Sequence, residues 1–278
     1  MEITYFARHN MVMLQKPFEA GSFLSDDASA LIVEVGETHC MMSLVNAEKM
    51  VLAVQVYTFD AESRESSVDE ILKLIPDSSS FEKVVIAAAF VETLLVPRRH
   101  HPHREWLLMH STSLNGFEPL TDAIAELQIE NAFGFPGALR QHFINRFPHA
   151  QFMHVYTPLL KVYNGVSSDE QLMVHFMYQQ FTVVLKQQQQ IQLAQTYQYT
   201  SPMDVVYYLL KISSEFGLSV EEVPVIISGF VSEDSALYKE LHQYFFKIQF
   251  SKNSKNSFGG DFPDHFFTSV YNIAACAL

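Results

Sequence analysis

Cysteine and long apolar runs are both scarce in this sequence. Cys40 and Cys276 are the two cysteines among 278 residues. They are too few for a disulfide framework or a thiolate metal cluster, and we expect both to be buried small hydrophobic residues. No apolar run reaches the roughly 18 residues that span a bilayer, and the N-terminal residues lack the basic region and apolar core of a signal peptide. These absences predict a cytoplasmic protein without membrane insertion.

Positive charge is the next shortage. The chain has 18 Lys and Arg against 31 Asp and Glu, a formal net charge of −13, which should repel a phosphate backbone and excludes nucleic acid as an expected partner. Three motifs of catalysis are missing as well: the hydrolase G-x-S-x-G, the P-loop G-x-x-x-x-G-K and a CxxC pair. Hydrophobic residues, in contrast, make up 48% of the sequence, which is enough to fill the cores of about two domains.

The first half of the chain predicts three consecutive strands followed by a helix, a strand, a second helix and a last strand. The strands are expected at Ala30–Val35, Thr38–Val45, Met50–Phe59, Lys83–Phe90 and Ala150–Tyr156. Ser67 and Glu70 have the spacing of a capping box at the start of the first helix, and apolar residues recur there at helical spacing from Val68 to Ile75. The second helix is expected at Gly137–Arg146.

The second half repeats this order of elements. Its strands are expected at Leu172–Met177, Phe181–Lys186, Ile191–Tyr199, Val223–Ser228 and Phe245–Phe250. The first helix of this half should begin at an N-cap, Ser201, and close at Gly217 in a left-handed conformation. Further helices are expected at Ser235–Gln243 and Asp264–Ala275. The repetition predicts a duplicated α/β unit, with a boundary within Tyr163–Glu170, where Gly, Ser and acids cluster.

The order of elements and four segments resemble an uncharacterised bacterial family, one of the domains of unknown function, with the fold of the actin-like ATPase superfamily of sugar kinases, heat-shock chaperones and actin. The segments are Thr93–Pro97, Asn145–Leu160, Ser201–Leu210 and Ile226–Tyr244. The resemblance implies an α/β protein of two ribonuclease-H-like units, arranged as two lobes with a cleft. It implies a first domain at residues 1–164, with an insertion at about 91–133, and a second domain at residues 165–278. The segments are packing and turn signatures, so they indicate a fold rather than an activity.

In active members of that superfamily, the first hairpin carries an acid, a glycine and a Ser or Thr that hold magnesium and phosphate. Glu34, Gly36 and Thr38 follow this outline, with Glu in place of the usual Asp and with Glu37 adding a negative charge where phosphate would lie. The same residues could equally form an ordinary hairpin.

The second hairpin should supply another acid and another glycine, yet no Asp, Glu or Gly occurs from Gln171 to Met203, and the corner is Met177–Phe181. Adenosine in the superfamily rests on a Gly-Gly turn. Here only Gly229 is present, and Phe230 stands in place of the second glycine. We therefore interpret Glu34, Gly36, Thr38 and Gly229 as the remnant of a nucleotide site without catalytic residues.

Histidines offer one further candidate site. His100 and His103 could share a helical face, as metal ligands do, but three arginines flank them and Pro102 suggests a helix N-terminus, so we predict no metal site. His154, in an expected strand, is interpreted as a half-buried polar residue rather than a base.

Three functional hypotheses follow. The first is a non-catalytic binding or scaffold protein, a pseudo-ATPase without a cofactor, whose partner is another protein. The alternative is a divergent ATPase or kinase-like enzyme that uses ATP and magnesium in the inter-lobe cleft. A sensor that binds a small ligand in the cleft without hydrolysis lies between them.

Overall fold

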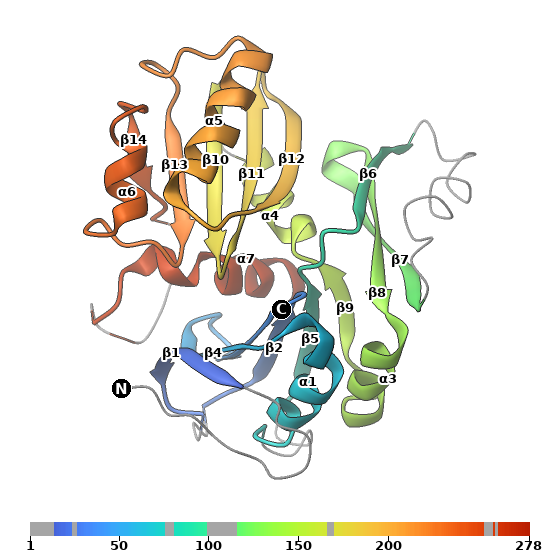
Figure 1. Ribbon diagram of the computed structural model, residues 1–278. Coiled ribbons are helices and arrows are strands. Elements are labelled where there is room, and N and C mark those ends of the chain that lie inside the picture. The colour runs from blue at the N-terminus through green and yellow to red at the C-terminus, as the bar shows by residue number, and fades with distance from the viewer. Residues whose placement is uncertain are drawn as a thin grey trace. The chain divides into compact units, whose positions relative to one another are not determined.

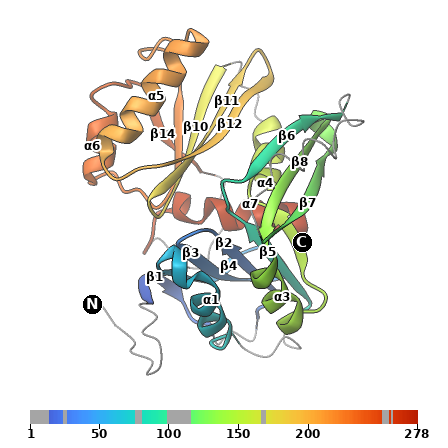
Figure 2. The ribbon, with the colours of Figure 1, turned by 45° about the vertical axis from the view of Figure 1, so that its right-hand side comes forward.

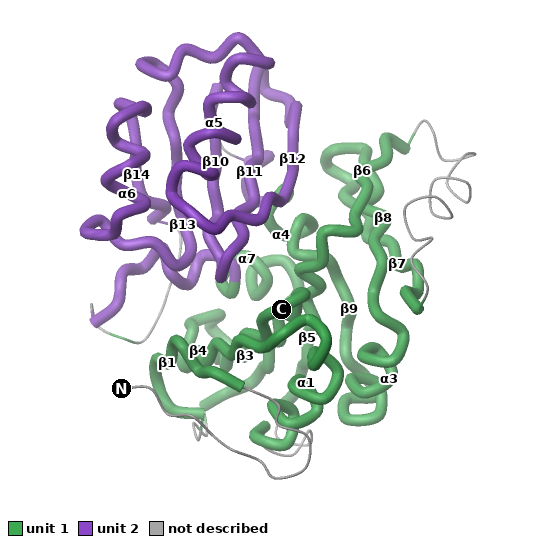
Figure 3. The backbone as a smooth tube through the Cα atoms, in the orientation of Figure 1, with its two compact units in different colours: residues 1–161, 256–258, 270–278 green, residues 162–255, 259–269 purple. Residues whose placement is uncertain are grey.

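The structure is a computed structural model that describes residues 14–23, 27–75, 81–98, 116–165, 170–252, 258 and 261–278. These residues form two compact units (Figure 3). Unit 1 comprises the described residues of Met1–Lys161, Asn256–Phe258 and Val270–Leu278, and unit 2 those of Val162–Lys255 and Gly259–Ser269. The C-terminal helix α7 (Thr268–Ala277) therefore belongs largely to unit 1, although it lies at the end of the second half of the sequence.

Unit 1 contains a six-stranded sheet with the order β1-β4-β3-β2-β5-β9 (Figure 1). Its strands are β1 (Gln15–Gly21), β2 (Ala30–Val35), β3 (His39–Val45), β4 (Val51–Thr58), β5 (Lys83–Ala88) and β9 (Gln151–His154). β2, β3 and β4 form an antiparallel meander, whereas β5 is parallel to β2 and β9 is parallel to β5. β1 was not expected; it pairs antiparallel with β4 and extends the sheet by one strand.

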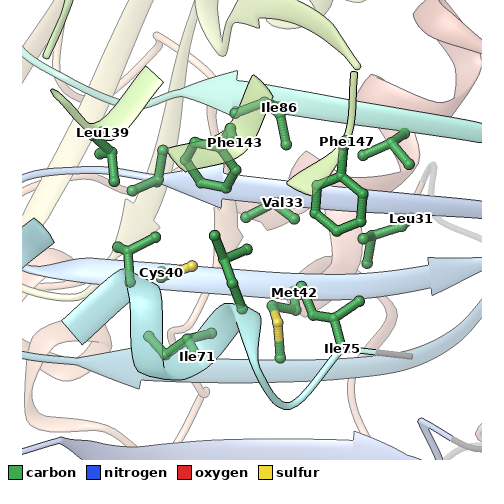
Figure 4. Close-up of a cluster of buried hydrophobic side chains, with 14 of the residues drawn as sticks. Leu31, Val33, Cys40, Met42, Ile71, Ile75, Ile86, Leu139, Phe143 and Phe147 are labelled. Atoms are coloured by element: carbon green, nitrogen blue, oxygen red, sulfur yellow. The ribbon is translucent and has the colours of Figure 1, made fainter. Parts of the chain in front are cut away.

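Helices α1 (Arg64–Leu72) and α3 (Gly137–Arg146) pack on one face of this sheet. In Figure 4, side chains of both helices, among them Ile71 and Phe143, point toward Val33 and Ile86 of the central strands. The expected apolar stripe is confirmed, but the expected capping box is wrong. α1 begins four residues earlier, at Arg64 after a 3-10 turn η1 (Ala61–Ser63), so Ser67 is buried inside the helix.

The segment that was expected to be an insertion forms a sheet of its own. β6 (Thr93–Pro97), β7 (Phe117–Ile124) and β8 (Ile129–Pro136) pair antiparallel in the order β6-β8-β7 (Figure 2). A short 3-10 turn, η4 (Ala125–Leu127), joins β7 to β8. Helix α4 (Tyr156–Asn164), which directly follows β9, was also not expected.

Unit 2 contains a five-stranded sheet with the order β12-β11-β10-β13-β14. Its strands are β10 (Glu170–Met177), β11 (Gln180–Gln187), β12 (Gln190–Gln198), β13 (Val225–Gly229) and β14 (Ile248–Phe250), and its helical elements are α5 (Pro202–Phe216), α6 (Ala236–Leu241) and η5 (Asp264–Phe267). α5 has the predicted N-cap at Ser201, in a capping box with Asp204, and ends at Gly217 with a left-handed φ of 66°. Both helix boundaries are confirmed.

The duplication is visible in the order and direction of the strands. β10, β11 and β12 form a meander like β2, β3 and β4, and β13 and β14 continue it in parallel as β5 and β9 do. Each meander hairpin and the C-terminal end of each parallel strand therefore have a counterpart in the other unit. The sequence placed the remnant of a nucleotide site at the first hairpin of unit 1 and at Gly229 of unit 2. Among the described residues no helix is both long and apolar enough to cross a membrane.

Candidate functional site

The corner between β2 and β3 is closed by the chain itself. Gly36 N–H donates to the His39 carbonyl at 3.0 Å, and Phe59 N–H donates to the Thr38 carbonyl at 3.0 Å. Glu34, at the end of β2, is buried, whereas Thr38 is only partly buried. The structure thus brings the three predicted residues of the first hairpin together in unit 1.

The space beside Gly36 is filled by a side chain of the same hairpin. A Cβ at Gly36 would lie 2.5 Å from Cε1 of His39 and 3.2 Å from the carbonyl oxygen of Ala89. A residue with a side chain would therefore displace the imidazole ring or the backbone. The close approach of His39 and Ala89 leaves little room for a side chain at Gly36, and this packing accounts for a glycine here without a phosphate.

His39 was not singled out by the sequence, yet it lies at the centre of this corner. Its side chain is buried, and within the described part of the chain neither ring nitrogen has a hydrogen-bond partner. Nε2 lies 3.7 Å from Oε1 of Glu34, which is an ion-pair distance if the ring is protonated. Burial, with a smaller contribution from Glu34, raises the pKa of the Cys40 thiol, so this cysteine is no candidate nucleophile.

Glu37 is paired rather than open to a ligand. Arg64 of α1 donates to its carboxylate at 2.5 Å, and the guanidinium lies over the Phe90 ring at 5.6 Å from the centroid. Burial raises the pKa of Glu37, and the charge of Arg64 acts in the opposite direction. The sequence interpretation took Glu37 as an uncompensated negative charge. The structure corrects this, because Arg64 offsets that charge.

His154 closes the same end of the sheet at β9, and its predicted half-burial is wrong. The ring is almost fully buried, Nε2 lies 3.0 Å from the Phe90 carbonyl, and Nδ1 accepts from Tyr156 N–H at 3.2 Å. Nε2–H is therefore the donor, which requires a neutral ring. Burial lowers the pKa of His154 to about 4. Both ring nitrogens form hydrogen bonds with the backbone, so neither is placed to act as a base.

Asp122 of β7 fastens the three-stranded sheet to this corner. Its Oδ2 accepts from His154 N–H at 2.7 Å and from the Thr157 hydroxyl at 2.6 Å. Burial raises the pKa of Asp122, while these hydrogen bonds lower it. The carboxylate thus links β7 to the backbone of β9 at His154 and to the Thr157 side chain in the first turn of α4.

The second hairpin, in unit 2, has no small residue at its corner. Tyr178 and Gln179 form the turn between β10 and β11, and Gln179 has a left-handed φ of 56°. The turn therefore contains neither an acid nor a glycine, as the sequence indicated. Within β10, before the turn, Nδ1 of His175 lies 2.9 Å from the Ser228 hydroxyl. This pair was missed; its one sequence signal is a histidine amid the apolar residues of an otherwise buried strand.

Gly229 ends β13 in unit 2, and its role is also explained by close backbone approach. It has φ +83°, and a Cβ there would lie 1.9 Å from the carbonyl oxygen of Phe176. The next residues are covered by η5: Phe230 packs edge-to-face on Phe266 with centroids 5.7 Å apart, and His265 Nε2 lies 2.7 Å from the Val231 carbonyl. Residues of η5 therefore cover the turn after Gly229, where the sequence placed a remnant of the adenosine site.

Two further candidate sites, a metal site and a surface groove, were considered in the described residues. No group of three His, Cys, Asp or Glu side chains could hold a metal ion in the part of the chain that the structure describes. His100 and His103 lie outside the described residues. A shallow groove of about 570 Å³ runs between α1 and α3, lined by Asp69, Leu72, Lys73, His142, Asn145 and Arg146. Asp69 lies 3.1 Å from Lys73 Nζ and 3.5 Å from His142 Nδ1 there, and Arg146 donates to the Ile75 carbonyl.

Comparison with known proteins assigns the chain to a family. Residues 20–248 match the family described as "Protein of unknown function (DUF3822)". The chain belongs to the DUF3822 family. A search of curated proteins found no match to this member.

Solved structures show the fold of this DUF3822 member. A Bacteroides thetaiotaomicron protein with an actin-like ATPase fold and unknown function matches with a TM-score of 0.73 and 14% identity, over 92% of this chain and 99% of that chain. The PilM–PilN type IV pilus biogenesis complex matches with a TM-score of 0.57 and 11% identity, over 90% of this chain and 98% of the other. The cytoplasmic domain of EpsL, an inner membrane component of the Vibrio cholerae type II secretion system, matches with a TM-score of 0.50 and 11% identity, over 90% and 95%.

These comparisons confirm the resemblance drawn from the sequence. The DUF3822 chain has two β-sheet lobes of the actin-like ATPase fold, and it belongs to a family of unknown function. Fold and activity are separable, so the choice between a catalytic and a non-catalytic protein depends on the hairpins and turns described above.

Proposed function

We propose that this DUF3822 protein is a non-catalytic binding or scaffold protein in the cytoplasm, a pseudo-ATPase whose partner is another protein. One observation carries the proposal: the ring of His39 and the carbonyl of Ala89 fill the space next to Gly36, the one glycine of the first phosphate hairpin. Phosphoryl transfer depends on backbone donors and magnesium placed around the phosphate, and the packing of His39 and Ala89 leaves no room for a phosphate on that side of Gly36.

Three further features support the same conclusion. The turn at Tyr178 and Gln179 has no acid to position magnesium and no glycine to admit phosphate. The turn at Gly229 is covered by Phe266 and His265. Two proteins of similar fold, EpsL and PilM, are described as parts of protein assemblies, a role that the proposal extends to this chain.

Thermal unfolding with and without magnesium and ATP tests the proposal. A ligand at 100 times its dissociation constant adds roughly 2.7 kcal/mol to stability, which raises the melting temperature of a protein of this size by several degrees. We expect no shift and no phosphate release above the buffer background.

A Thr38→Val variant is the matched control, because it removes a hydroxyl from the hairpin without changing its shape. A dissociation constant of about 10 μM or tighter, with phosphate release that is lost in Thr38→Val, would contradict the proposal. That result would identify a divergent ATPase that uses the hairpin as a site.

A further inference from the structure

Most sheet edges in the described residues carry features that discourage pairing with another strand. Natural edge strands are protected by charge, proline, irregular pairing or short length. β1 contains Lys16, Pro17 and Glu19 and pairs irregularly, and β7 contains Glu118, Pro119 and Asp122. β9 and β14 have four and three residues, and β6 has five and ends at Pro97.

β12 is the exception. It forms one edge of the unit 2 sheet, has nine residues (Gln190–Gln198), and contains no charged residue and no proline. A register shift in its pairing with β11 lies near its start, and pairing is regular from Leu193 onward. None of its residues is buried. Because β12 lacks the charge, proline and short length that protect the other edges, it is suited to accept another strand.

The backbone groups that face outward can be assigned. Tyr199 N–H donates to the Gln179 carbonyl at 3.0 Å, in the same register that pairs Gln198 with Gln180. In an antiparallel pair, successive residues direct their N–H and C=O groups alternately toward and away from the neighbouring strand. Ala194, Thr196 and Gln198 therefore direct theirs away from β11, and of these the Thr196 carbonyl accepts from the Gln195 side chain at 3.4 Å.

Aromatic side chains connect β12 to α5. Tyr197 of β12 stacks on Tyr208 of α5 with centroids 4.2 Å apart, and Tyr207 packs edge-to-face on Tyr208 at 5.3 Å. Tyr207 is 58% exposed and Met203, one turn before it, is 48% exposed. When a strand is added to a sheet, hydrogen bonds give affinity and neighbouring pockets for alternate side chains give specificity. Tyr207 and Met203 are exposed side chains of α5 that are available for such contacts.

Charge favours a cationic segment over a second copy of the chain. Unit 2 has ten Asp and Glu against five Lys among its described residues, and one of those lysines, Lys186, is buried. Glu215 lies close enough to Tyr197 to help raise the pKa of that phenol, after burial, which is the larger cause. Two copies with a net charge of −13 each repel one another, whereas a basic segment is attracted.

We propose that β12 binds an extended segment of a partner protein as an added strand, with alternate apolar side chains against Tyr207 and Met203 and with a net positive charge. This inference deepens the proposed function, on which it rests, by naming the surface and the chemistry of the partner.

A synthetic peptide tests the proposal on the full chain. The probe is a capped seven-residue peptide that alternates lysine with valine or phenylalanine, measured by isothermal titration and by amide hydrogen exchange. One control peptide has glutamate in place of lysine, and a second has N-methyl groups on alternate residues, which removes the N–H donors of one edge. We expect the lysine peptide to bind at least about tenfold more tightly than either control and to protect the amides of β12 from exchange.

Two pairs of variants locate the site. Ala194→Pro removes an outward N–H that the β11 pairing does not use, and Ala194→Val keeps it, so only the proline variant should lose binding. Gln195 is exposed, and Gln195→Lys should weaken binding while Gln195→Glu strengthens it. Circular dichroism of each variant checks that unit 2 is folded.

Several results would overturn the proposal: no detectable binding, equal affinity for the N-methylated peptide, or protection on another strand. Sedimentation that shows a dimer lost in Ala194→Pro would also overturn it, because a second copy would then be the occupant. The nucleotide assay separates the two hypotheses. ATP turnover with peptide binding intact refutes only the non-catalytic function, whereas absence of both refutes only the β12 surface.

Discussion

Two glycines of unit 2, Gly217 and Gly229, allow the cost of a left-handed backbone to be measured separately from the cost of a steric clash. Alanine at each position tests the structure directly. Gly217 has φ +66° and nothing within 4 Å of a Cβ, whereas Gly229 has φ +83° and a Cβ there would lie 1.9 Å from the carbonyl oxygen of Phe176. Both substitutions place a Cβ in the left-handed region, but only one also forces two strands apart.

The expected magnitudes differ clearly. A left-handed conformation costs a residue with a Cβ roughly 1–2 kcal/mol, and restricting the unfolded chain returns about 0.4–1 kcal/mol, so Gly217→Ala should lower the free energy of unfolding by about 1 kcal/mol. Overpacking typically adds about 1–3 kcal/mol or more. The contact with Phe176 involves the backbone of β10, which cannot rotate away, so Gly229→Ala should cost about 1–3 kcal/mol more than Gly217→Ala.

Urea unfolding followed by far-ultraviolet circular dichroism measures both variants, and hydrogen exchange of β10 and β13 reports whether the loss is local to this strand pair. We expect Gly229→Ala to have the lower midpoint and the faster exchange. Equal losses for the two variants would refute the reasoning, because the carbonyl of Phe176 could not then lie against Gly229. A nucleotide role for Gly229 would instead predict an unchanged fold and a change in ATP affinity alone.

Three further predictions concern stability. Gln188 and Gln189 both have left-handed φ values in the β11–β12 turn, so the double change Gln188→Asn, Gln189→Gly should raise the free energy of unfolding by about 1 kcal/mol; an unchanged urea midpoint would contradict those conformations. His154 stays neutral in the fold down to its pKa of about 4, against 6.5 as the ordinary value, whereas the unfolded chain takes up the proton near 6.5. Its contribution to the free energy of unfolding, up to roughly 3 kcal/mol, is therefore present above pH 6.5 and lost as the pH falls toward 4. The free energy of unfolding of a His154→Gln variant should change less with pH over that interval than that of the wild type. Lys186 is buried and donates to two carbonyls at the end of α4, so Lys186→Met should cost about 1–3 kcal/mol; a variant as stable as the wild type in urea would show that these carbonyls need no donor.

Local patterns predicted much of the architecture. The strands of both meanders, the helix from Ser201 to Gly217 and the duplicated order of elements were all predicted, because alternation, helical spacing and caps are properties of neighbouring residues. Where a pattern had two interpretations, the prediction failed. Ser67 and Glu70 have the spacing of a capping box, yet the helix starts at Arg64, because the preceding 3-10 turn already directs the chain into it.

Elements that depend on distant partners were missed. β1 is a strand because it pairs with β4, and its own sequence contains a proline and charges that argue against one. β6, β7 and β8 pair mainly with one another in a segment that was interpreted only as an insertion. Their strand character follows from a shared ladder of hydrogen bonds, which a sequence window does not contain.

The sequence by itself determined the residue types at the candidate site: one glycine in the first hairpin, none in the second, and Phe230 beside Gly229. Only the tertiary structure decided why those residues are there. The ring of His39 lies against Gly36, the carbonyl of Phe176 lies against Gly229, and Arg64 neutralises Glu37. The last two of these contacts join residues far apart in the chain, and packing and ion pairing depend on distances in space, which residue identity and spacing along the sequence do not specify.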